Sequence, residues 1–363
     1  MKKGMIPKFG MGVALAAALA FGSAPIAKAD LDDTLSLTEP RGVLVMPFDQ
    51  TDNHQSYQLV SRIDAVGLDP VDEAVVATHW SFWSKDCRHL ADVLICLTKN
   101  DTVVVDPGAL VGQLQAPAPR ANLPFGSSFD LSGEQGFIVV TSYVASTGPS
   151  GLDCVIVSVD DIADDQLVGS WVIADLSTNA AFGNDALGLR HGELPDPSTY
   201  IGPDTSGLFV QTFNPLDLGD SDVIVIGLEY DDDTINGTGS GRFIGVEHGP
   251  LRDRGTPRVQ CDLEFFDDLE VMVSLPDVQF DCALFAPISI DQGDNPLIPA
   301  SMTLDTPFGG FLNLTRCTVI DLETRDRIPV GEEFAQFLFA FHGQAVGQFG
   351  TVVSGKYNSL GQE

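Results

Sequence analysis

The stretch EAVVATHWSFWSKDCRHLADVLICLTKNDTVVVDP, residues 73–107, decides the fold of this chain. It contains three runs that are rich in β-branched and aromatic residues, with short polar turns between them. Runs of this length and composition are typical of β-strands. The stretch therefore predicts three consecutive strands, at Val75–Trp83, Val93–Leu97 and Thr102–Val105.

The first of these runs also predicts which side chains face the core. Successive side chains of a strand point to opposite faces, so Val76, Trp80 and Phe82 share one face and form the better core candidate. Trp83 points the other way and is expected to cover an edge. His79 is expected to be a structural residue whose imidazole is hydrogen-bonded.

The rest of the chain continues the strand pattern. No window of a dozen residues beyond the N-terminal segment has a 3.6-residue apolar period with caps at both ends. Many short apolar runs separated by Gly, Pro, Asn and Asp predict an all-β fold of β-sandwich units, Ig-like or jelly-roll-like. In the first half, further strands are expected at Arg41–Phe48, Tyr57–Val66, Gly136–Val144, Cys154–Val159, Leu167–Leu176 and Ala180–Leu189.

The order of these elements restarts after residue 206. The segment 191–206 is rich in Pro, Gly and Asp, which is typical of a linker. Beyond it, five segments parallel earlier ones in the same order: GLFVQTF (207–213), DVIVIGLEY (222–230), CDLEFFDDLEV (261–271), VQFDCALF (278–285) and GGFLNLTRCTVIDLE (309–323). Their earlier counterparts are, in the same order, GVLVMPF (42–48), the second expected strand (Tyr57–Val66), THWSFWSKDCR (78–88), DVLICLTK (92–99), and QGFIVVTSY (135–143) with CVIVSVD (154–160). We therefore predict an internal duplication of two units, 41–190 and 207–363.

The N-terminal 29 residues have the features of a cleaved signal peptide. Three early lysines precede the apolar run MGVALAAALAF (11–21), and Ala27-Lys28-Ala29 places small residues at the cleavage site. The run is shorter than the roughly 20 residues that cross a bilayer. The chain is therefore expected to be exported to the periplasm, the cell surface or the medium, with residues 30–40 as a flexible lead-in and no membrane insertion.

The chain is strongly acidic. It has 51 Asp and Glu against 19 Lys and Arg, a formal net charge of −32. Such a surface repels nucleic acid and anionic lipid, so neither is an expected partner. Its simplest role is to keep an exported protein soluble.

Six cysteines follow the signal peptide: Cys87, Cys96, Cys154, Cys261, Cys282 and Cys317. An even number in an exported chain predicts disulfides, and no C-x-x-C pair favours zinc. Proximity favours Cys87–Cys96 and Cys261–Cys282, whereas the repeat favours Cys96–Cys154 and Cys282–Cys317. We favour Cys87–Cys96, which needs little loop closure, and leave the other pairs open.

No catalytic motif is present in recognisable form. The near matches to G-x-S-x-G (237–241) and to the Asp-Thr-Gly of aspartic proteases (204–207) both have the wrong spacing. The best candidate for a metal is the acidic turn at residues 231–237, where Asp232, Thr234 and Asn236 could hold Ca²⁺. Phe243 at the twelfth position excludes an EF-hand. No other cofactor is expected.

Part of the first unit resembles a known group of proteins. HWSFW (79–83), CLTKNDTVVVD (96–106), GFIVVTSYV (136–144) and DDQLVGSWVIADLSTNAAFGNDALGL (164–189) are similar to exported bacterial β-rich proteins with a tryptophan-bearing strand and a CLTxND-type turn. The resemblance covers about 120 residues. It implies an exported β-rich protein, and it brings no catalytic residues because the function of that group is unknown.

Two functions fit these observations. The first is a non-enzymatic surface or extracellular protein with a structural, adhesive or assembly role, which self-associates or binds other envelope proteins. The second is a secreted β-sandwich hydrolase or carbohydrate-binding protein with glycans as partners. Trp80, Trp83 and Trp171 distinguish them, since exposed coplanar tryptophans would favour sugar binding and buried ones would weigh against it.

Overall fold

The structure is a computed structural model that confirms the all-β fold. It describes residues 40–63, 75–86, 88–109, 131–147, 154–156, 166–177, 180–189, 208–213, 219–229, 258–267, 272–287, 297, 310–320, 327–329, 336–346 and 351–355. The predicted signal peptide, almost all of the lead-in and the linker 191–206 lie outside these residues. No described helix has the length and apolar character that crossing a membrane requires.

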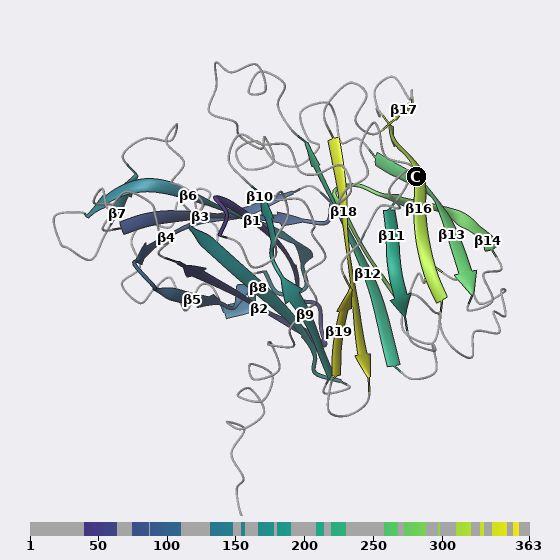
Figure 1. The fold of residues 1–363 in the computed structure, drawn as a ribbon, viewed down its shortest axis with the longest axis horizontal. Coiled ribbons are helices and arrows are strands. Elements are labelled where there is room, and N and C mark those ends of the chain that lie inside the picture. The colour runs from purple at the N-terminus through teal and green to yellow at the C-terminus, as the bar shows by residue number, and fades with distance from the viewer. Residues whose placement is uncertain are drawn as a thin grey trace, which may run out of the picture. The chain divides into compact units, whose positions relative to one another are not determined.

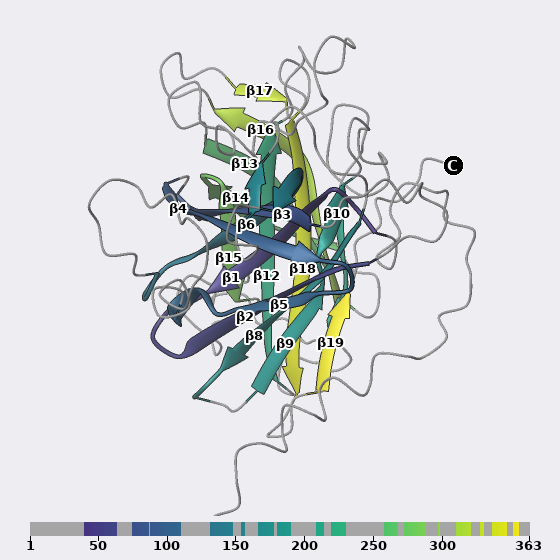
Figure 2. The same cartoon turned by 90° about the vertical axis from the view of Figure 1, so that its left-hand side faces the viewer.

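Ten strands and one 3-10 turn belong to the first half. They are β1 (Val43–Asp49), β2 (His54–Arg62), β3 (Val75–Ser84), β4 (His89–Thr98), β5 (Thr102–Val105), η1 (Pro107–Ala109), β6 (Gln135–Thr147), β7 (Cys154–Ile156), β8 (Leu167–Asp175), β9 (Ala180–Asp185) and β10 (Leu187–Leu189). They form two antiparallel sheets, one in the order β10-β1-β6-β3-β4 with β7 beside β6, the other in the order β5-β2-β8-β9. Figure 2 shows β5, β2, β8 and β9 side by side.

Several strand predictions need correction. The strand expected at Val93–Leu97 begins earlier, as β4 at His89, and the strand expected at Gly136–Val144 continues to Thr147, as β6. The strand expected at Tyr57–Val66 begins earlier, as β2 at His54. The strand expected at Ala180–Leu189 is divided at Ala186, whose amide donates to the carbonyl of Gly169. The division lets β9 pair with β8 while β10 pairs with β1 in the other sheet.

The second half repeats this strand order. Its strands are β11 (Leu208–Phe213), β12 (Gly219–Glu229), β13 (Arg258–Asp267), β14 (Met272–Phe280), β15 (Ala283–Pro287), β16 (Gly310–Ile320), β17 (Arg327–Pro329), β18 (Gln336–Val346) and β19 (Thr351–Gly355). Its sheets have the orders β11-β16-β13-β14, with β17 beside β16, and β15-β12-β18-β19. Each order is that of the first half with ten added to the strand numbers, apart from β10 (Figure 1). A duplication would produce this arrangement, and its origin from one ancestral unit stays a prediction.

The strand registers support the alignment of CDLEFFDD with THWSFWSK. Ser84 of β3 pairs with Gly136 of β6, and Asp267 of β13 pairs with Gly310 of β16. Counting back from these pairs places Phe265 where Phe82 lies, and both are fully buried. The same counting places Cys261 at the position of Thr78.

Other parts of the sequence alignment are wrong. Cys282 was aligned with Cys96, but Cys96 lies within β4 whereas Cys282 lies after the end of β14, in the turn before β15. Cys317 was aligned with Cys154, but Cys317 lies on β16, the counterpart of β6, and Cys154 begins β7. Apolar patterns alone do not show where a strand ends, so the sequence alignment matched the wrong positions at Cys282 and at Cys317.

The β10-β1-β6-β3-β4 sheet is buried on both faces. On one face lie Leu44, Trp80 and Val140, each at most 2% exposed. On the opposite face lie Val45 and Val139, which are equally buried. Strands covered on both sides are expected to be continuously apolar, and the buried run VLVMPF of β1 has this character. The predicted core face of β3 is therefore confirmed, but Trp83 does not cover an edge, since β3 lies between β6 and β4 and Trp83 is 3% exposed.

A glycine is required where β6 passes the end of β3. A Cβ atom added at Gly136 would lie 1.8 Å from the carbonyl oxygen of Trp83. No side chain can occupy that space without moving the β3 backbone. Gly310 pairs with Asp267 in the corresponding place of the second half.

Truncation of Trp80 tests the core. Trp80 is fully buried and its indole nitrogen donates to Thr78 Oγ1 at 2.9 Å. We expect Trp80→Ala to lower the free energy of unfolding by about 3–5 kcal/mol, measured by urea denaturation, because it leaves a large cavity. Val104→Ala, at a side chain that is 52% exposed, is the control and should change it by about 0.5 kcal/mol or less.

Candidate functional site

The three tryptophans form no surface platform. Trp80, Trp83 and Trp171 are 0%, 3% and 1% exposed. Trp171 packs edge-on against Phe182, with ring centroids 6.0 Å apart. A sugar ring stacks on an exposed aromatic face, so these tryptophans cannot provide one in this conformation.

His79 lies in a small polar cluster between β3 and β4. Its Nε2 lies 3.1 Å from Oδ1 of Asp92, and the Ser81 hydroxyl donates to the same oxygen at 3.0 Å. The ring of Tyr143 lies beside the imidazole, 6.3 Å away between centroids. The predicted pairing of the His79 imidazole is confirmed, and its structural role stays a prediction.

A second polar cluster lies at the β1–β2 turn. Asp49 accepts hydrogen bonds at Oδ1 from the amide and hydroxyl of Thr51, at 2.9 and 2.6 Å, and at Oδ2 from Gln135 Nε2 at 2.8 Å. His54 Nδ1 lies 3.1 Å from the Thr51 hydroxyl. In a nucleophilic triad the hydroxyl would donate to the histidine, whereas here it donates to the carboxylate. Lys85 Nζ extends the cluster by donating to Gln135 Oε1 at 2.9 Å. The arrangement stabilises a turn and leaves no activated nucleophile.

The predicted calcium loop lies outside the described residues. Asp232, Thr234 and Asn236 are therefore not placed, and the Ca²⁺ site stays a prediction. Among the residues that are described, no group of three or more His, Cys, Asp or Glu could hold a metal ion.

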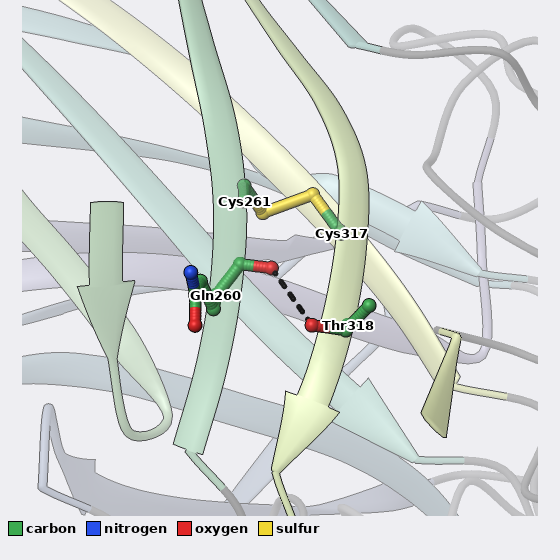
Figure 3. The surroundings of a disulfide bond; sticks show 4 residues. All are labelled: Gln260, Cys261, Cys317 and Thr318. Atoms are coloured by element: carbon green, nitrogen blue, oxygen red, sulfur yellow. Dashed lines mark hydrogen bonds between the residues drawn. A yellow bond between two sulfur atoms is a disulfide. The ribbon is translucent and has the colours of Figure 1, made fainter. Parts of the chain in front are cut away.

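One disulfide joins the central strands of the second half. Cys261 of β13 bonds to Cys317 of β16, with Cα atoms 4.0 Å apart (Figure 3). Next to it, the Thr318 hydroxyl donates to the carbonyl of Gln260 at 3.5 Å. Both predicted partners of Cys282, Cys261 and Cys317, are therefore wrong, because these two cysteines lie on paired strands and bond to each other.

The preferred Cys87–Cys96 bridge is also incompatible with the strand register. Cys87 lies outside the described residues, but its neighbour Arg88 is described and adjoins β4 at His89. Cys96 is seven residues beyond His89 on that extended strand, a distance of about 23 Å. A disulfide requires Cα atoms within about 7 Å, so closeness in sequence was misleading here. Cys96 and Cys282 are both disulfide-bonded.

The CLTKND segment is a tight turn between β4 and β5. Asp101 Oδ2 accepts hydrogen bonds from the hydroxyl and the amide of Thr98, and these bonds lower the pKa of Asp101. Asn100 has a φ of 60°, a left-handed conformation that Asn adopts more readily than most residues. Arg62 NH1 donates to the carbonyl of Leu97, which ties the turn to β2. The motif that carries the resemblance thus has a structural role.

Strand β2 has an inverted polarity: its buried side carries mostly polar side chains, and apolar ones lie on its more exposed side. Its buried side chains are Ser56, Gln58, Val60 and Arg62, three of them polar, while Tyr57 and Leu59 are only partly buried. Each inward polar side chain makes at least one hydrogen bond: Ser56 Oγ to the carbonyl of Asp49, Gln58 Nε2 to that of Pro47, and Arg62 Nε to Gln166 Oε1.

The apolar side chains of the opposite side form what we call the outer face of the β5-β2-β8-β9 sheet. It consists of Tyr57, Leu59, Ile63, Val104, Val168, Val172 and Leu176. Register places Val104 opposite Leu59, and Val172 opposite Tyr57. Ile63, Val104, Val172 and Leu176 are 38–57% exposed. Among the residues whose side-chain burial is described, Met272 is the one exposed large hydrophobic side chain that lies elsewhere. Sequence reasoning missed this face, although the alternation of Tyr57 and Leu59 with Ser56 and Gln58 was its signal.

Two groups modify the electrostatics of the outer face. Burial and the carboxylate of Asp106 raise the pKa of Tyr57, so its phenol stays neutral. Asp106 itself accepts a hydrogen bond from Gln55 Nε2 at 2.9 Å. Asp185, on the edge strand β9, lies opposite Ser170 and brings a carboxylate to the margin. The centre of the face is uncharged.

Comparisons with known proteins add no assignment. No family model and no curated protein matches the chain. One matching solved structure is that of the M60 catalytic domain with the CBM51-1 and CBM51-2 domains from Clostridium perfringens ZmpB. The match has 9% identity and a TM-score of 0.16, and it covers 84% of this chain and 34% of that chain. At that score it carries no argument about fold or function.

Acid titration tests the CLTKND turn. The folded-state pKa of Asp101 is lowered, so its contribution to stability is present above the unfolded pKa of about 3.9 and is lost as pH falls through the folded value. We expect the free energy of unfolding of the wild type to fall more steeply below that pH than that of Asp101→Asn. Urea denaturation at a series of pH values measures both, and parallel curves would contradict the expectation.

Tryptophan fluorescence tests the burial of the indoles. Because all three are at most 3% exposed, we expect the emission of the native protein to resist quenching by iodide and to be unchanged by added oligosaccharides. The urea-unfolded protein is the control and should be quenched. A sugar-dependent shift of the native emission would show that a tryptophan reaches a ligand.

Proposed function

We propose that the protein is a non-enzymatic exported protein with a structural role, and that it assembles with further copies of itself through the outer face of the β5-β2-β8-β9 sheet. The observation that carries the proposal is the inverted polarity of β2. A strand that turns Gln58 and Arg62 inward and Tyr57 and Leu59 outward is adapted to a second covered face. Contiguous exposed apolar surface on a soluble protein commonly marks an interaction site.

Charge argues for a second copy as the occupant. The chain carries a net charge of −32, so two copies repel each other over most of their surfaces. The centre of the outer face has no charged group, and there the repulsion is weakest and the apolar gain greatest. A cationic partner would instead be drawn to the acidic surface elsewhere.

Export rests on the sequence of residues 1–29 and fits the disulfides. Disulfides persist in oxidising compartments such as the periplasm and the extracellular space. An assembly role at the cell surface or outside it suits a chain held together by such bonds. The resemblance to exported β-rich proteins supports the same location outside the cytoplasm.

A secreted carbohydrate-binding protein or hydrolase is the weaker alternative. Its decisive feature would be exposed tryptophans, and Trp80, Trp83 and Trp171 are buried. The histidine and carboxylate clusters around Asp49 and Asp92 are engaged in hydrogen bonds within the chain. No observation favours this alternative over the structural role.

Lysine substitutions on the outer face test the proposal. We expect the wild type to form oligomers in sedimentation velocity as concentration rises, and Val104→Lys/Val172→Lys to remain monomeric, because a buried ammonium at the contact is unfavourable. Met272→Lys is the matched control, since Met272 is 53% exposed but lies on β14. It should associate like the wild type.

Circular dichroism and urea denaturation of all three proteins should show that they share one fold. A wild type that stays monomeric at every concentration tested would overturn the proposal. Equal loss of association in Met272→Lys would show that the outer face is not the contact.

A further inference from the structure

The disulfide partner of Cys282 lies in the first half of the chain. Cys282 is disulfide-bonded, and Cys261 and Cys317 are bonded to each other. The other cysteines of the sequence are Cys87, Cys96 and Cys154, all of which precede the linker. The bond of Cys282 therefore connects strands on opposite sides of residues 191–206.

The backbone places Cys282 beside Lys85. The amides of Cys282 and Ala283 both donate to the carbonyl oxygen of Lys85, at 2.9 and 3.1 Å. Lys85 directly follows β3, in the turn that leads to β4, and its own amide donates to the carbonyl of Gln135 at 2.8 Å. Cys282 thus lies at the turn end of the β3–β4 hairpin.

Cys96 and Cys154 lie far from this point. Cys96 pairs with Ala77, and Ala77 is eight residues from Lys85, about 26 Å of extended strand. Cys154 pairs with Thr147, at the opposite end of β6 from Gln135. Since the Cα atoms of a disulfide lie within about 7 Å of each other, neither cysteine reaches Cys282.

We propose that Cys282 forms a disulfide with Cys87, and that Cys96 consequently pairs with Cys154. Cys87 is two residues from Lys85 and adjoins Arg88 in the sequence, and it is the cysteine that remains once Cys96 and Cys154 are excluded. The bond forms by loss of two protons and two electrons from the two thiols. A protein disulfide of the export compartment accepts the electrons by thiol–disulfide exchange and leaves as a dithiol.

This bond links the two halves of the chain covalently at a second point. The chain already joins them through residues 191–206, and the Cys87–Cys282 bond closes a loop that contains this linker. Cleavage of the linker would therefore leave the halves attached until the disulfide is reduced. The Cys261–Cys317 bond, by contrast, lies within the second half alone.

A non-reducing peptide map tests the pairing directly. The purified protein is blocked with a maleimide at low pH, unfolded, and digested with trypsin and a glutamate-specific protease. Cleavage after Lys85, Arg88, Lys99, Arg190, Glu270 and Arg316 separates all six cysteines. The expected cross-linked pairs are residues 86–88 with 271–316, 89–99 with 135–190, and 259–264 with 317–323.

The third pair is an internal control, because it contains Cys261 and Cys317. A link between residues 86–88 and 89–99, or between 89–99 and 271–316, would overturn the proposal. So would a maleimide on Cys282 in the wild type.

Single substitutions provide a second, independent readout. In Cys87→Ser we expect maleimide to label Cys282 and to leave Cys96 and Cys154 unlabelled. Cys96→Ser is the matched control and should expose Cys154 while Cys282 stays protected. Label on Cys282 in Cys96→Ser would overturn the proposal, and if a variant fails to fold, the wild-type map decides.

Discussion

Burial of both faces of the β10-β1-β6-β3-β4 sheet is the constraint on which the rest of the first half depends. Trp80 and Val140 pack on one face and Val45 and Val139 on the other, so apolar side chains are needed on both sides of the strands, most fully in β1. One connected set of buried side chains includes these residues together with Val223–Ile226 of β12. A shift of one residue would move every side chain of a strand to the opposite face, where Trp80 would meet different neighbours, so the packing on the two faces fixes the register and the turns.

Much of the fold could be predicted because strands and turns are encoded locally. Thr102–Val105 was predicted with the right ends, and the alternation in β3 identified its core face. What could not be predicted depends on contacts between distant residues. The pairing of Cys261 with Cys317 follows from the β13–β16 register, and the exclusion of Cys87–Cys96 follows from the length of β4. Neither the register nor the strand end is visible in composition.

The outer face of the β5-β2-β8-β9 sheet illustrates a different limit of prediction from sequence. Alternation shows that Tyr57 and Leu59 lie opposite Gln58, but not which of the two sets faces the core. The usual assumption places the apolar set inside. The structure places the polar set inside because Gln58 and Arg62 find hydrogen-bond acceptors in Pro47 and Gln166. Burying a polar group is tolerable only when it is paired in this way, and such pairing emerges only once the neighbouring strands are in place.

The position shared by Thr78 and Cys261 shows that residues two apart in a strand constrain one another's chemistry. In the first half Thr78 accepts the indole hydrogen of Trp80 and donates to the carbonyl of Ile95. A cysteine there would deprive the tryptophan of its oxygen acceptor. In the second half Leu263 occupies the position of Trp80. Its side chain has no hydrogen-bond donor, so position 261 needs no oxygen acceptor and can be a cysteine. Replacing Thr78 alone by cysteine would therefore leave the Trp80 indole without this oxygen acceptor, whereas a cysteine is compatible with the aliphatic side chain at position 263.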